Sequence, residues 1–95
     1  MSQFEAGQIT ATPGAIGAVE DSEESLDEFL RRHLACDWGD VTAADKEANA
    51  EALVSGARLF SVYQLKSDQR LWIITEATND VGARESTCVL LPNEY

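Results

Sequence analysis

The hydrophobic residues of this chain follow a helical period in its first half and a strand period in its second half. Between residues 26 and 34, apolar or half-apolar side chains recur every three or four positions, which predicts a helix with one apolar face. The set comprises Leu26, Phe29, Leu30, His33 and Leu34. From Arg58 onward, short runs rich in β-branched and aromatic residues follow one another, as is typical of strands.

We expect three helices in the first half, over about 13–19, 25–35 and 43–55. Each begins at or directly after a residue suited to cap a helix N-terminus, namely Thr12, Ser25 and Thr42. Ser25 and Glu28 have the spacing of a capping box, in which each side chain bonds to the other's backbone N–H. Residues 20–24 are interpreted as a link, and Gly56 is expected to end the third helix.

The runs LFSVYQL, LWIITEA and STCVLL predict three consecutive strands joined by short turns, which make an antiparallel meander over residues 57–95. Residues 1–12 show no sustained period and are interpreted as an extended lead-in. The sequence therefore predicts one α+β domain over residues 1–95. In this domain, two or three N-terminal helices pack on a three-stranded antiparallel sheet. The helices belong to the acidic half, residues 13–56.

The charge of the chain is concentrated in one segment. Of 17 acidic residues, 11 lie between Glu20 and Glu51, where only three basic residues oppose them, so this segment carries a formal charge of −8 out of −10. Residues 52–95 carry only −1. Such a field repels nucleic acid and anionic membranes and attracts proteins that have a basic surface. We therefore expect neither direct nucleic-acid binding nor membrane binding.

Two interpretations of the acidic segment stay open. If the chain is helical throughout, Glu20, Glu24 and Glu28 form a row of carboxylates about 6 Å apart, spaced like the phosphates of one nucleic-acid strand. Alternatively, the segment is a solvated face that keeps a small protein soluble. The first interpretation gives a set of partner-binding residues: Glu20, Asp21, Glu23, Glu24, Asp27, Glu28, Asp37 and Asp40.

The sequence contains no pattern of residues with a recognisable catalytic or ligand-binding chemistry. His33 is the single histidine and lacks an accompanying nucleophile motif, so we expect a half-buried histidine at a helix end. Cys36 and Cys88 have no metal-binding or redox spacing, and the acidic residues do not follow an EF-hand, so neither a metal nor a cofactor is expected. The N-terminus does not resemble a secretory signal, and we expect a cytoplasmic protein.

Several blocks of sequence stand out together between residues 12 and 95. They are Thr12–Ala15, HLACDWGDV (33–41), Ala52-Leu53 with Gly56, RLFS (58–61) with Tyr63, WIITEA (72–77) and LLPNEY (90–95). This succession resembles a family of small bacterial proteins carried on plasmids and integrative elements. Its members are described as plasmid-related proteins, and some bear the label "type I restriction endonuclease subunit M". The resemblance implies a mobile-element habitat, and EDSEESLDEF is unusually acidic for it.

Charge and habitat together suggest a non-enzymatic inhibitor of a host defence complex that handles nucleic acid, anti-CRISPR-like or anti-restriction-like. Its acidic half would occupy a basic surface otherwise reserved for nucleic acid. An antitoxin or adaptor that neutralises a basic partner protein has the same sign of charge and is the alternative. An enzyme acting on a small molecule is a second alternative, and a homodimer formed through the sheet is a further expectation.

Overall fold

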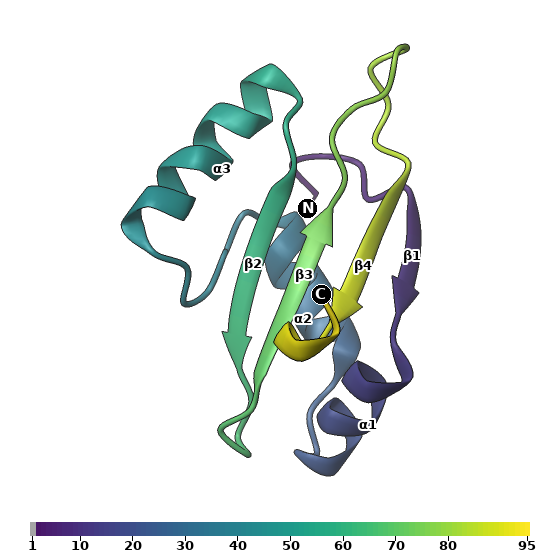
Figure 1. Cartoon of the computed structure of the whole chain (residues 1–95), viewed down its shortest axis with the longest axis vertical. Helices are drawn as coiled ribbons and strands as arrows, with labels where there is room; N and C mark the ends of the chain where they lie inside the picture. The colour runs from purple at the N-terminus through teal and green to yellow at the C-terminus, as the bar shows by residue number, and fades with distance from the viewer. Residues whose placement is uncertain (1) are drawn as a thin grey trace.

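The computed structural model describes residues 2–95, which form three α-helices, a four-stranded sheet and a short 3₁₀ turn (Figure 1). In chain order these are β1 (Gln8–Ala11), α1 (Pro13–Asp21), α2 (Leu26–Leu34), α3 (Ala43–Ser55), β2 (Leu59–Gln64), β3 (Arg70–Thr75), β4 (Ser86–Leu90) and η1 (Pro92–Glu94). In this described part of the chain, every helix is too short or too polar to cross a lipid bilayer.

The sheet is mixed, so the expected three-stranded antiparallel meander is wrong. Strands β2, β3 and β4 pair antiparallel as predicted, but β1 adds a fourth strand parallel to β4, giving the order β1-β4-β3-β2. Residues 8–11 of the expected lead-in form this strand, in which Gln8 pairs with Ser86. No local pattern indicates β1, because it is four residues long, largely exposed, and paired with a segment far along the chain.

Strand β1 leads directly into α1 through residues with clear local roles. Gly7 has a φ of 65°, and the backbone of Arg84 and Glu85 fills the space that a Cβ atom would need, so glycine is required before the strand. Thr12 closes the pairing with β4 by donating its N–H to the Val89 carbonyl (3.0 Å). The Thr12 hydroxyl then accepts from the Ala15 N–H (3.0 Å), which confirms the predicted cap of the first helix.

The other helix predictions hold with two corrections. Helix α3 begins after Thr42, whose hydroxyl accepts from Asp45 N–H, and ends at Gly56, which has a φ of 85°. Helix α2 lies within its predicted range, but the Ser25 side chain makes no capping bond, so the predicted capping box is wrong. Helix α1 extends to Asp21, beyond its expected end at residue 19.

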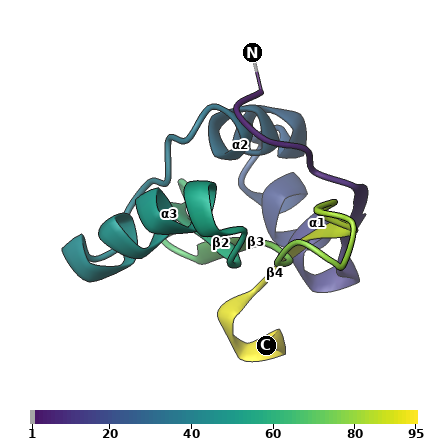
Figure 2. The same cartoon turned by 90° about the horizontal axis from the view of Figure 1, so that it is seen from above.

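Helices α1 and α2 cover one face of the sheet, and α3 lies along the edge of β2 (Figure 2). The main core lies beneath the first two helices and includes Ala15, Val19, Phe29, Leu30, Tyr63, Leu65, Leu71, Ile73 and Val89. At the edge, the Asn49 amide pairs with both backbone groups of Phe60, accepting from its N–H (3.1 Å) and donating to its carbonyl (2.8 Å). This side chain protects an edge strand that could otherwise pair with another chain.

Candidate functional site

Most of the carboxylates expected to bind a partner lie at one end of the molecule, where α1 meets α2. We call this end the acidic corner; it comprises Glu20, Asp21, Glu23, Glu24, Asp27 and Glu28. All of them except the half-buried Glu24 are exposed. The connection between the two helices lies at the bottom of Figure 1, at one extreme of the 38 Å long axis.

The chain turns sharply within the acidic corner. Glu23 has a φ of 59°, in the left-handed region, and its N–H donates to the Glu20 carbonyl (3.0 Å). The Glu24 N–H donates to the Val19 carbonyl (3.1 Å), which completes a Schellman turn. The condition for a row of Glu20, Glu24 and Glu28, one continuous helix, is therefore not met, because α1 ends between the first and second of these residues.

Two features of the acidic corner cost stability. A left-handed conformation costs a residue with a Cβ atom roughly 1–2 kcal/mol, and Glu23 adopts it where glycine is usual. Glu20 and Asp21 lie in the last turn of α1, at the negative end of the helix dipole, and no basic residue balances them there. Asp27 and Glu28 lie favourably in the first turn of α2. The corner thus places negative charge at both helix ends, although only one of them favours it.

Glu24 differs from the other members of the corner because its carboxylate has a partner. It accepts a hydrogen bond from the Lys66 backbone N–H (2.9 Å), which ties the corner to the hairpin between β2 and β3. Within residues 2–95, the other five carboxylates of the corner have no cationic side chain within 4.0 Å. The five exposed carboxylates therefore face solvent, while the sixth, that of Glu24, anchors the corner to the hairpin.

Asp37 and Asp40 lie apart from the acidic corner, beyond the C-terminal end of α2. The nine residues of that helix span about 13 Å, so the eight expected residues do not form one patch. The Asp40 N–H donates to the Val62 carbonyl (2.7 Å), which helps to cover the open edge of β2. Asp40 remains exposed, but its backbone has a structural role.

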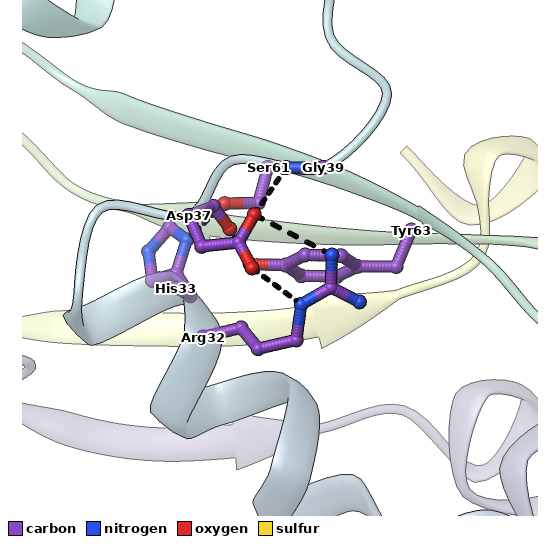
Figure 3. A network of polar contacts seen from close by, with 6 residues as sticks. All are labelled: Arg32, His33, Asp37, Gly39, Ser61 and Tyr63. Atoms are coloured by element: carbon purple, nitrogen blue, oxygen red, sulfur yellow. Dashed lines mark hydrogen bonds and ion pairs between the residues drawn. The ribbon is translucent and has the colours of Figure 1, made fainter.

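Asp37 organises a network of polar contacts in front of β2 (Figure 3). Arg32 donates through Nε to one Asp37 oxygen (2.7 Å) and through Nη2 to the other (3.4 Å), and this hydrogen-bonded ion pair lowers the carboxyl pKa. The Arg32 guanidinium lies over the Tyr63 ring (4.5 Å to its centre), and the Tyr63 hydroxyl donates to the Asp37 carbonyl (2.6 Å). These contacts identify Asp37 as a residue that fixes the loop after α2.

His33 lies in the core and is fully buried, not half-buried as expected. Its Nδ1 atom lies 2.5 Å from the Ser61 hydroxyl and its Nε2 atom lies 2.9 Å from the Thr75 hydroxyl. Thr75 in turn contacts the Thr87 hydroxyl (2.7 Å), and Thr87 donates to the carbonyl of Ala6 (2.7 Å). Burial lowers the pKa of His33 to about 4, so the ring is neutral at physiological pH.

The direction of each hydrogen bond in this chain follows from its last member. A carbonyl only accepts, so Thr87 uses its one hydroxyl proton on Ala6, and Thr75 must therefore donate to Thr87. Thr75 then has no proton left for His33, which must donate from Nε2. The Nδ1 atom of the neutral ring consequently accepts from Ser61. The arrangement satisfies every polar atom in a buried chain that joins α2 to three strands.

The residues that join His33 were missed at the sequence level, although a signal for them existed. Ser61, Thr75 and Thr87 occupy inward positions of their strands, alternating with outward residues. Polar residues on the buried face of a strand need partners, and a single histidine on a neighbouring helix supplies them. The sequence indicated the strands but not which of their faces would be buried.

Within residues 2–95, no three side chains of His, Cys, Asp or Glu come together in a way that could hold a metal ion. Both cysteines are half-buried free thiols, and burial raises the pKa of Cys36. Comparisons with protein-family models, curated proteins and solved structures find no match for the chain. Its function is therefore inferred from its charges and surfaces.

Proposed function

We propose that this protein is a non-enzymatic inhibitor from a mobile genetic element, and that it acts in the cytoplasm on a host complex that targets nucleic acid. The acidic corner would bind a basic surface of that complex, anti-CRISPR-like or anti-restriction-like, and exclude its nucleic acid. The observation that carries the proposal is a group of five exposed carboxylates on two adjoining helix ends that have no cationic partner among residues 2–95. Charge complementarity of this kind raises both association rate and specificity.

The local cost of the corner supports a binding role. The solubility of a protein depends on how many surface charges it carries. It gains nothing from the position of Glu20 and Asp21 at the unfavourable end of α1. Features that cost stability in one place are typical of functional sites. By contrast, His33 and Ser61, which would be the natural pair for catalysis, have no exposed surface on which to meet a substrate.

Reversing charge at the corner tests the proposal. Glu20→Lys with Glu23→Lys should weaken binding to the effector complex at least about tenfold, because two attractive interactions become repulsive. The measurement is inhibition of DNA binding and cutting by purified host restriction and CRISPR effector complexes. Lysine at position 20 suits the helix dipole, so the fold should survive, as circular dichroism would check.

A matched control separates position from net charge. Glu47→Lys with Glu76→Lys changes the total charge equally, at two exposed carboxylates outside the corner, and should leave most of the inhibition in place. Inhibition should also weaken as salt rises, since exposed charges are screened. Equal losses in both double variants, or a complex insensitive to salt, would reject the acidic corner as the binding surface.

A further inference from the structure

A second surface of unusual composition lies at the end of the molecule opposite the acidic corner. The C-terminal end of α3 and the connection between β3 and β4 lie at this end (Figure 1). Together with residues 3–5 they line an open hollow of about 860 Å³. Its lining includes Leu53, Val54 and Val81, which are 41%, 91% and 85% exposed. We call this the apolar hollow. Large aliphatic side chains gathered this way on a surface mark an interaction site.

The walls of the hollow are tied together by buried polar contacts. The Arg84 guanidinium donates to the carbonyls of Ala52 (3.0 Å), Ala57 (2.7 Å) and Glu76 (2.9 Å), which come from α3, the connection before β2 and the residue after β3. Thr78 donates its N–H to the Gly56 carbonyl (2.8 Å). The hollow is therefore preformed, and a partner would not have to order it on binding.

The charges around the hollow are negative. Glu5 lines it directly, Glu51 lies one helical turn before Val54, and Asp80 precedes Val81; all three are exposed. The basic residue in the lining, Arg84, is buried and turned toward backbone carbonyls. A second copy of this chain would bring two such acidic rims together, so the charge disfavours self-association through this surface.

We propose that the apolar hollow binds the apolar side of an amphipathic, basic segment of a partner protein, with aliphatic residues over Val54 and Val81 and lysine or arginine facing the acidic rim. Apolar anchors supply most of the energy of an interface, while charges at its rim supply orientation and rate. This surface goes beyond the proposed function of the acidic corner and does not depend on it.

The test uses a fluorescently labelled amphipathic helical peptide built from leucine and lysine, and an oligolysine of equal net charge. Val54→Ser with Val81→Ser should weaken binding of the leucine-lysine peptide about tenfold or more, because the anchors lose their apolar contact. Binding of oligolysine should not change. In nuclear magnetic resonance spectra, the leucine-lysine peptide should shift the amides around Val54, Thr78 and Val81 in the wild-type protein.

Ile16→Ser is the matched control, since Ile16 is 42% exposed on α1 and lies outside the hollow. It should leave binding of both peptides as in the wild type. Equal effects of Ile16→Ser and the double variant would overturn the proposal. A dimer that sedimentation detects in the wild type but not in the double variant would also overturn the proposal. The occupant of the hollow would then be a second copy of this chain. A failure here leaves the charge-reversal experiment at the corner unaffected.

Discussion

The acidic corner and the apolar hollow lie at opposite ends of the molecule, and each follows a helix that stops at a residue in the left-handed conformation. At the hollow, α3 stops at Gly56, with a φ of 85°, the residue that adopts this conformation most easily. At the corner, α1 stops before Glu23, with a φ of 59°, which pays a steric cost there. Both helix ends thus use a left-handed residue, but the residue type differs.

The difference shows that each end gives up stability in its own way. The corner accepts a strained backbone and unfavourable helix-end charges, but exposes only groups that water solvates well. The hollow has a well-formed helix end, but leaves Val54 and Val81 in water, where their apolar surface gains nothing. Both patterns are expected of surfaces that are completed by a partner.

The largest predicted effect concerns the core that carries both ends. The pKa of His33 is lowered from 6.5 to about 4, so between these values the unfolded chain binds a proton that the native protein does not. The contribution of His33 to the free energy of unfolding is therefore fully present above pH 6.5. It decreases by roughly 3 kcal/mol as the pH falls toward 4. Urea unfolding at a series of pH values in this window measures it.

His33→Gln provides the reference for that experiment. Glutamine does not titrate, and the two proteins are otherwise identical in sequence, so the difference between the two pH profiles isolates the histidine. The variant should be less stable than the wild type near neutral pH and lose less on acidification. Parallel profiles would mean that the ring takes up its proton as readily in the native protein as in the unfolded chain, so that burial does not lower the pKa of His33.

How far the sequence predicts this molecule depends on how local each feature is. The face formed by Leu26, Phe29 and Leu30 repeats within one helix, and α2 was predicted accordingly. Strand β1 depends on residues 86–89, which no local period reveals. The same holds for Asn49, whose amide covers the edge of β2 from a neighbouring helix.

The candidate site follows the same rule. The number and sign of the charges in the acidic corner could be counted along the chain, but their arrangement depends on a turn at Glu23. The link predicted at 20–24 anticipates a break between the two helices, but glutamate does not indicate a left-handed residue, so the shape of the turn was not predicted. The apolar hollow was not anticipated at all, because Val54 and Val81 come together only through the pairing of distant segments.

The next prediction compares the two helix ends directly. Glu23→Gly should raise the free energy of unfolding by about 1 kcal/mol, because glycine relieves the steric cost of the left-handed turn. Gly56→Ala should lower it by about 1–2 kcal/mol, because alanine takes on that cost and its Cβ atom meets the Thr78 side chain. Urea unfolding measures both changes.

Glu23→Ala separates conformation from charge, because alanine also has a Cβ atom, and so the same steric cost in the left-handed conformation, but no carboxylate. It should have nearly the wild-type stability. If it were as stable as Glu23→Gly, charge repulsion rather than the backbone would be the cost at the corner. Changes of the same sign for Glu23→Gly and Gly56→Ala would remove the contrast between the two ends.

The smallest expected effect tests the other side of the contrast. Val54 is 91% exposed, and serine has nearly the same helix propensity as valine, so Val54→Ser should change the free energy of unfolding by less than about 0.5 kcal/mol. Ala52, two residues earlier on the same helix, is 1% exposed, and Ala52→Ser should cost about 1–3 kcal/mol by burying a hydroxyl. A loss at Val54 as large as that at Ala52 would mean that the hollow closes over this side chain in solution. Val54 would then belong to the core, and the apolar end would have no surface left for a partner to complete.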